Sequence, residues 1–158
     1  MPRSASLRRC LASALIALPR TGCTGSLGKV VAPGQPLAPC PSSPNCVSSE
    51  SAPSDTVHAM AAIAFTDTPD VAHTRARAAL LAERRTALTL EQSGYLRAEA
   101  TSLIFRYVDD VEIVVDSAAR VFRFRSASRI GKGDLGVNRA RMTRVGERLR
   151  AGSSSGSR

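Results

Sequence analysis

The sequence contains no tryptophan, and aromatic residues make up only 4% of its 158 residues. A buried core must therefore be built mainly from Leu, Val, Ile and Ala, with a few Phe and Tyr. The chain also lacks the GxSxG and HExxH patterns, a Walker P-loop, and a pair of carboxylates at the spacing of an acid–base site. These absences leave no motif for a common hydrolase or nucleotide-binding site, and we expect no cofactor.

The apolar run near the N-terminus is too short to cross a bilayer. It covers residues 11–18, LASALIAL, whereas a spanning helix takes about 20 apolar residues. Three arginines precede it: Arg3, Arg8 and Arg9. A basic start followed by a short apolar stretch predicts a secretory signal peptide, which we place at residues 1–22.

The residues after this run resemble a bacterial lipoprotein box. RTGC ends at Cys23, and Thr21 and Gly22 are the small residues expected before a lipidated cysteine. Arg20 stands where Leu is usual, so an ordinary secreted protein is the alternative. Twenty of the 22 basic residues are Arg, which favours a GC-rich bacterial genome. We therefore expect an exported, periplasm-facing lipoprotein of the bacterial cell envelope, held at the membrane through Cys23.

Acidic residues are scarce at both ends of the chain. Residues 1–49 carry five basic and no acidic residues, residues 50–119 carry six basic and eleven acidic, and residues 120–158 carry eleven basic and two acidic. The formal net charge of +9 suggests nucleic-acid binding, but the basicity is local and an exported protein seldom meets DNA. We expect no nucleic-acid partner, and the oligomeric state stays open.

The four cysteines are not equivalent once a signal peptide is removed. Cys10 leaves with it and Cys23 takes the lipid, so Cys40 and Cys46 remain in an oxidising compartment. The five residues between them include two prolines and allow a tight turn closed by a disulfide. The alternative is a zinc site with four ligands: Cys40, Cys46, His58 and His73. Zinc usually takes cysteines with two to four residues between them, so the longer spacing here favours the disulfide.

A segment rich in Pro, Gly and Ser precedes the regular structure. We expect residues 23–54 to form the lipid-anchored tether and the cysteine turn, residues 55–150 one α+β domain, and residues 151–158 a disordered tail. Thr68 as N-cap, followed by Pro69, predicts the start of a helix at DTPDVAHTRARAALLAERR. Three apolar residues then fall on one helical face: Val71, Ala78 and Leu81.

From residue 86 the hydrophobic period changes to two, which predicts an antiparallel β-meander of about five strands. The strands are TALTLE (86–91), YLRAEA (95–100), LIFRY (103–107), VEIVV (111–115) and RVFRF (120–124). A helix over residues 139–150 follows, with Met142, Val145 and Leu149 as its apolar stripe. The fold class is therefore α+β, with one helix before the meander and one after it.

Side-chain alternation also predicts the register of the sheet. Loops at residues 108–110 and 116–119 set five apolar pairs: Leu103–Val115, Phe105–Ile113, Tyr107–Val111, Phe122–Ile113 and Phe124–Val111. On the other face Glu112 falls between Arg106 and Arg123, and Asp110 falls across from Arg125. We interpret these charges as a solvated sheet face with ion pairing.

The stretch RSASRIGKGDLGVNRAR joins the last strand to the last helix. Gly131, Gly133 and Gly136 permit positive φ, and exposed N–H groups in such a loop can hold an anion. Four basic residues are the candidates for binding an anion or a partner: Arg125, Arg129, Lys132 and Arg139. The alternative is a turn with a solvated basic rim.

Four segments together resemble the family catalogued as domain of unknown function 1499. They are CPSSPNCVSS, a tyrosine with AEATS, FRYVDDVEIVVD, and RSASRIGKGDLGVNRAR, in that order from Cys40 to about Arg150. The resemblance implies a small bacterial envelope protein or lipoprotein. It implies no activity, because no reaction is established for the family.

Two function hypotheses follow from these patterns. The first is an envelope lipoprotein that binds an anionic envelope component or a protein partner through the basic glycine-rich loop. The second is a hydrolase or transferase that uses a cleft near CPSSPNC. It requires three residues, Asp55, His58 and His73, to converge with a nucleophile such as Ser48 or Ser49. A shared site further requires the CPSSPNC turn and the RSASRIGKGDLG loop to face the same cleft.

Overall fold

The computed structural model describes residues 31, 35–104 and 106–153. The predicted signal peptide, Cys23 and residues 154–158 of the predicted tail lie outside this part of the chain. The elements are β1 (Cys46–Ser48), β2 (Ile63–Ala64), α1 (Pro69–Leu81), β3 (Thr86–Gln92), β4 (Tyr95–Thr101), β5 (Val108–Asp116), β6 (Val121–Ser128) and α2 (Val137–Ser153). Across the described residues, no helix is long and apolar enough to cross a membrane.

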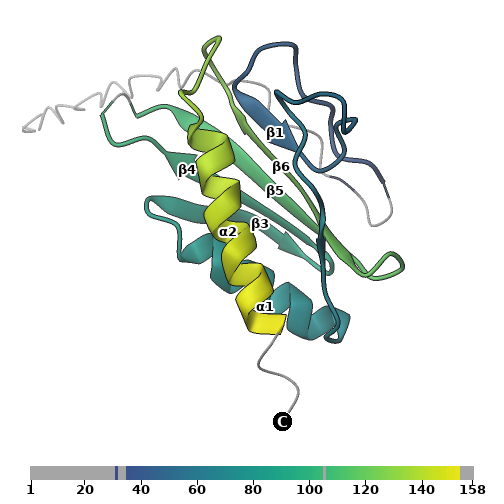
Figure 1. Cartoon of the computed structure of the whole chain (residues 1–158). Helices are drawn as coiled ribbons and strands as arrows, with labels where there is room; N and C mark the ends of the chain where they lie inside the picture. The colour runs from purple at the N-terminus through teal and green to yellow at the C-terminus, as the bar shows by residue number, and fades with distance from the viewer. Residues whose placement is uncertain (1–30, 32–34, 105, 154–158) are drawn as a thin grey trace, which may run out of the picture.

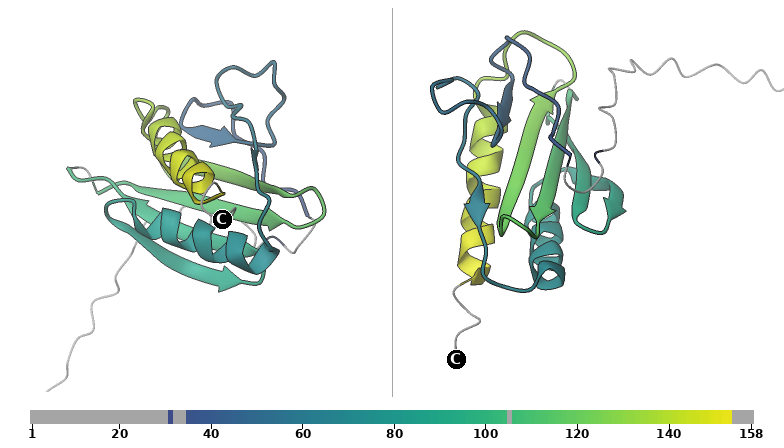
Figure 2. Two further views of the ribbon diagram at one scale, coloured as in Figure 1. Left: turned by 60° about the horizontal axis from the view of Figure 1, so that its bottom comes forward. Right: turned by 90° about the vertical axis from the view of Figure 1, so that its right-hand side faces the viewer.

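The strands form one antiparallel sheet with both helices on one face. Its order is β1-β6-β5-β4-β3, and the short β2 also pairs with β6. Strands β3 to β6 form a meander, with α1 before it and α2 after it (Figures 1 and 2). The predicted α+β fold class is confirmed. The sheet also contains β1, which lies before residue 55 and pairs with the far end of β6.

The start of α1 is as predicted, but its buried face is different. The hydroxyl of Thr68 accepts a hydrogen bond from the N–H of Val71, and Pro69 opens the helix. The buried residues are mostly small and follow helical spacing: Ala72, Ala76, Ala79 and Leu80. Val71 and Leu81 are 54% and 42% exposed, so the predicted apolar face of α1 is wrong. The prediction used the larger apolar side chains, which face solvent. The buried face consists mostly of alanines, which let the helix approach the sheet closely.

The core lies between the two helices and the inner face of the sheet. Phe122 and Phe124 of β6 are buried there, together with alternate residues of β5. The predicted stripe of α2 is confirmed, because Met142, Val145 and Leu149 are all fully buried. Burial of each such side chain contributes about 1.5–3 kcal/mol.

The predicted sheet register is wrong in two places. Residues 103, 104, 106 and 107 are not in a strand, residue 105 lies outside the described residues, and β5 pairs with β4 instead. The apolar side chains Leu103 and Ile104 are 67% and 78% exposed. On the other side of β5, Val115 pairs with Phe122 and Ile113 with Phe124. The turn occupies residues 117–120, one position later than predicted, so each pair moves by two residues and stays on the same face.

The central part of the sheet's outer face, on β4 and β5, is buried, and not solvated as predicted. Glu112 is 2% exposed and lies between Arg97 and Arg125, at 3.6 Å from each, in place of the predicted Arg106 and Arg123. The phenolic O–H of Tyr95 donates to Glu112 at 2.6 Å. Burial, reinforced by this hydrogen bond, raises the pKa of Tyr95 well above its ordinary value.

Residues of the predicted tether cover part of this face. Val31 and Leu37 pack with Tyr95 and Val114 and are less than a tenth exposed. The backbone N–H of Leu37 donates to Glu50, whose carboxylate also pairs with Arg123. The sequence of the predicted tether did not indicate this packing, because its apolar residues are isolated among prolines and form no periodic pattern.

A charged clamp joins the two helices at one end of the core. Glu83 follows α1, is 7% exposed, and pairs with Arg144 and Arg148 of α2. Burial alone raises the pKa of Glu83, but the hydrogen bonds from the two arginines outweigh it and hold the pKa below its ordinary value.

We expect the clamp to give the protein an acid-sensitive part of its stability. A carboxylate with a lowered pKa stabilises the folded state above its unfolded pKa of about 4.3, and this contribution is lost as the pH falls through the folded pKa. Glu83→Gln should therefore lower the free energy of unfolding by about 1–2 kcal/mol at pH 7. In urea unfolding the difference should shrink below about pH 4. The exposed Glu147→Gln is the control, and a loss at Glu83→Gln that does not change with pH would contradict the clamp.

Candidate functional site

The two distinctive sequence motifs meet at one end of the sheet. The side-chain amide of Asn45, in the CPSSPNC turn, donates to the carbonyl of Gly131 at 2.8 Å. Asn138, at the start of α2, donates back to the carbonyl of Asn45 at 3.2 Å. We call this end, where β4 and β6 finish and β5 and α2 begin, the loop end of the sheet (Figure 1).

The cysteine pair closes the CPSSPNC turn. Cys40 and Cys46 form a disulfide with their Cα atoms 5.6 Å apart, so the predicted pairing is confirmed. Cys46 is also the first residue of β1 and pairs with Ala127 of β6. The disulfide therefore fixes the turn to the edge of the sheet beside the glycine-rich loop.

A buried polar network joins these segments. It consists of Asn45, Asp109, Ser126, Ser128, Asp134, Asn138 and Arg141, and we call it the Asn138 network. The Asn138 side chain accepts from Ser126 at 2.5 Å and from Arg141 at 2.8 Å. Its amide group faces three acceptors at 2.8–3.2 Å. Arg141 in turn donates to Asp109 at 2.6 Å, and Asp109 accepts from Ser128.

The network continues the inner face of the sheet with polar residues. Ser126 follows Phe122 and Phe124 in the two-residue period of β6. Asn138 and Arg141 lie one turn before Met142 and Val145 on the buried face of α2. The alternation that predicted the core therefore pointed to these polar residues as well. The sequence prediction missed them because it followed only apolar positions.

The Asn138 network has a structural role. Its members are each bonded to other members or to nearby backbone, and Asn138 and Ser126 are fully buried. A buried hydrogen-bonded network of this kind fixes one geometry, because each broken bond leaves a desolvated polar group. The motif that is most specific in sequence thus joins the cysteine turn, β6 and α2.

Three of the four predicted cationic residues have partners within the protein. Arg129 pairs with Asp110 and Glu99, and the hydrogen bonds to Asp110 raise the pKa of Arg129 above its ordinary value. Arg125 pairs with Glu112 on the outer face. Arg139 donates to backbone carbonyls, including that of Val57 at 2.8 Å.

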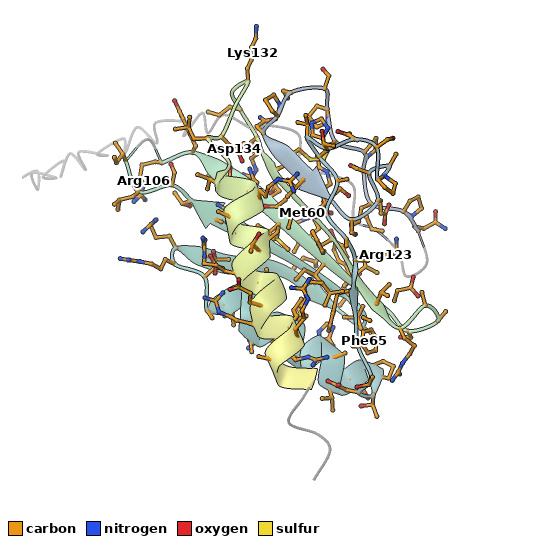
Figure 3. All side chains as sticks on the ribbon, viewed as in Figure 1. Met60, Phe65, Arg106, Arg123, Lys132 and Asp134 are labelled. Carbon is orange, nitrogen blue, oxygen red and sulfur yellow. A yellow bond between two sulfur atoms is a disulfide. The ribbon has the colours of Figure 1, made fainter. Side chains whose placement is uncertain are left out.

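The fourth, Lys132, is exposed at the tip of the glycine-rich loop and points away from the domain (Figure 3). Gly131 and Gly136 have positive φ, as their loop positions require. The N–H groups of the loop do not form an open cradle, because Asp134 accepts from those of Gly136 and Asn138. Asp134 therefore acts as the cap of α2 and takes the place an external anion would have.

The residues of the zinc and hydrolase hypotheses come together only in part, because Asp55 and His58 are in contact but His73 lies away from them. The ring nitrogens of His58 face Asp55 at 2.7 Å and the carbonyl of Ser43 at 3.1 Å. His73 lies on α1 and contacts Glu91 of β3, at the opposite edge of the sheet. The described residues contain no group of three or more His, Cys, Asp or Glu that could hold a metal ion.

The two serines near the cysteine turn bond to backbone. The Ser49 hydroxyl accepts from the N–H of Phe124 at 2.8 Å, and the Ser48 hydroxyl accepts from the N–H of Glu50. A cavity of about 260 Å³ beside the turn is lined by Leu37, Pro39, Cys40, Ser48, Glu50, Ser51 and Asp55. Its two charged side chains are both acidic, and Ser48 has no base bonded to it among the residues described. This geometry does not form a nucleophile–base pair.

A larger cavity of about 520 Å³ lies at the opposite end of the sheet. It is bounded by the first turns of α1, the β3–β4 turn and the end of β5, and His73 and Asp116 are in its lining. Asp116 already accepts from two backbone N–H groups and pairs with Arg123. This cavity and the two sequence motifs are therefore separate features of the fold.

The comparisons with known proteins give one match. No curated protein and no solved structure matches the chain. A family model matches residues 36–149, from just before the CPSSPNC turn to near the end of α2. The match covers both motifs that meet at the loop end and most of the chain. The chain therefore belongs to the family described as Protein of unknown function (DUF1499).

Proposed function

We propose that the protein is an exported lipoprotein of the bacterial cell envelope, held at the membrane by a lipid on Cys23, and that it binds an anionic envelope component at the loop end without catalysing a reaction. The segment ahead of Cys23 has the pattern of a signal peptide. The Cys40–Cys46 disulfide is consistent with an oxidising compartment.

The charge at the loop end is the observation that supports binding of an anion. Its basic side chains on the surface are Arg84, Arg85, Arg106 and Lys132. Arg106 and Lys132 have no hydrogen bond or ion pair in the part of the chain that the structure describes. The carboxylates near them are already satisfied, since Glu99 and Asp110 pair with Arg129, and Asp134 caps α2. Positive charge without a counter-charge attracts anions.

The proposal can be tested on protein extracted from membranes. Its intact mass should show an acyl adduct, and no thiol should react without reductant. Inorganic triphosphate should then raise the melting temperature by roughly 5 °C at about ten times its Kd, and added salt should weaken the effect by screening. The double variant Arg106→Gln with Lys132→Gln should lose this response while keeping its stability in dilute buffer.

The control is Arg150→Gln, which removes an exposed charge at the far end of α2. It should respond to triphosphate like the unaltered protein. An unmodified mass would remove the anchor from the proposal. A response that persists in the double variant would show that the anion binds elsewhere on the arginine-rich surface.

A further inference from the structure

The loop end concentrates exposed apolar side chains. Nine large apolar residues are exposed in the described part of the chain, and six of them lie at this end, five on two connections and one at the start of α2. They are Leu103, Ile104 and Tyr107, between β4 and β5, Ile130 and Leu135, between β6 and α2, and Val137, the first residue of α2. Exposed apolar side chains concentrated at one end of a molecule are typical of a surface that contacts a protein or a membrane.

The backbone at these positions supports a role beyond packing. Leu135 is fully exposed and has a φ of 53°, and Arg106 has a φ of 56°. Residues other than glycine rarely adopt this left-handed conformation, and strained positions of this kind cluster at functional sites. The Leu135 side chain is fully open to solvent, so internal packing does not explain why a leucine is held there.

We propose that the two connections, the docking loops, insert their apolar tips into the surface of a bilayer that contains anionic lipids. This inference rests on the proposed function and names the lipid headgroup as its anionic component. Arg106 and Lys132 lie on the same two loops as the apolar tips (Figure 3). An apolar tip beside free cations matches the boundary between acyl chains and anionic headgroups.

The length of the predicted tether allows this orientation. Val31, which packs on the outer face near the start of β4, is eight positions after Cys23 in the sequence. A fully extended chain of this length spans about 27 Å. The distance along β4 from Tyr95 to Thr101 is about 20 Å. A lipid on Cys23 can therefore hold the domain with its loop end at the membrane surface, where a high effective concentration favours weak docking.

The absence of tryptophan from the sequence makes insertion directly measurable. Leu135→Trp and Ile104→Trp each give the lipidated protein a single tryptophan at a docking loop. In phosphatidylcholine vesicles with phosphatidylglycerol, its emission should shift to shorter wavelength and be quenched by lipids brominated on the acyl chains. Val71→Trp, on the exposed face of α1, is the matched control and should be neither shifted nor quenched.

Charge and apolar contacts should contribute separately. In the Ile104→Trp protein, adding Leu135→Ser should reduce the docking equilibrium about tenfold, whereas adding Val71→Ser should leave it unchanged. Lys132→Gln removes one charge and should reduce the docking equilibrium about fivefold. Omitting phosphatidylglycerol removes the lipid partner of both Arg106 and Lys132, and should reduce docking about fivefold for each of these two charges. Arg150→Gln should have no such effect.

The outcomes separate this inference from the proposed function. Quenching at both loop positions that depends on phosphatidylglycerol supports docking to an anionic membrane. A triphosphate response without quenching in vesicles keeps anion binding and overturns membrane docking. Loss of both responses overturns both. A blue shift that appears without vesicles and rises with protein concentration would assign the surface to a second copy of the chain, and would also overturn the inference.

Discussion

Arg141→Met should destabilise the protein by about 3–5 kcal/mol. Arg141 is 6% exposed, and it donates to Asp109, Ser126 and Asn138. Methionine fills similar space but leaves the Asp109 carboxylate buried without its counter-charge. Removing one member of a buried ion pair destabilises a protein more than removing both members. Urea unfolding followed by circular dichroism would measure the change, with a lower midpoint and an unchanged slope.

A double variant separates the ion pair from simple loss of packing. Asp109→Leu combined with Arg141→Met removes both charges and should be more stable than the single variant by at least about 1 kcal/mol. Arg150→Met, on the exposed last turn of the same helix, should change the stability by less than about 0.5 kcal/mol. A loss below 1 kcal/mol for Arg141→Met would mean that the Asn138 network does not hold α2 against the sheet.

The sequence predicted those elements of the fold whose pattern is local. The N-cap at Thr68 and the apolar stripe of α2 each depend on residues within a few turns of helix, and both are present in the structure. The strand pairing was harder because LIFRY alternates like a strand yet lies in a connection. Alternation specifies faces but not lengths, so one misplaced turn shifted the predicted pairing of β5 with β6 by two residues.

In the candidate site, too, local patterns were predicted and contacts between distant parts of the chain were missed. The disulfide between Cys40 and Cys46 followed from the cysteine spacing and the expected compartment. The anion site predicted around Arg129 did not take account of the carboxylates that pair with it, because Asp110 and Glu99 lie 19 and 30 residues away along the chain. Only the folded sheet shows which cations are neutralised. Its geometry moves the proposed binding surface from Arg129 to Arg106 and Lys132.

Stability and the proposed binding therefore depend on different, neighbouring residues of the loop end. The most distinctive residues of the glycine-rich stretch, such as Asn138, are buried and structural. The residues proposed to meet a membrane lie at the tips of the loops that this buried network positions. We thus expect substitutions in the network to act through unfolding, and substitutions at Leu135 or Lys132 to act on binding with little change in stability.

Glu112→Leu should also destabilise the protein by about 3–5 kcal/mol. Glu112 is 2% exposed, and its carboxylate lies 3.6 Å from Arg97 and from Arg125 and accepts the hydrogen bond of Tyr95. Leucine removes the negative charge that these two arginines share and leaves the buried phenol without its acceptor. Glu112→Gln keeps a polar acceptor for Tyr95, so its loss of stability should be smaller in the same urea titration.

Coupling energies test which arginines this carboxylate contacts. Double-mutant cycles that combine Glu112→Gln with Arg97→Gln or Arg125→Gln should give coupling of about 1 kcal/mol or more, because each pair lies on adjacent strands. Cycles with Arg106→Gln or Arg123→Gln should give less than about 0.5 kcal/mol, since Arg106 is exposed on a docking loop and Arg123 pairs with Glu50 and Asp116. Strong coupling to Arg106 and Arg123 in place of Arg97 and Arg125 would mean that the sheet pairs in the register favoured by simple alternation. In that register β6 is shifted by two residues along β5, and the LIFRY segment replaces β4 as the other neighbour of β5.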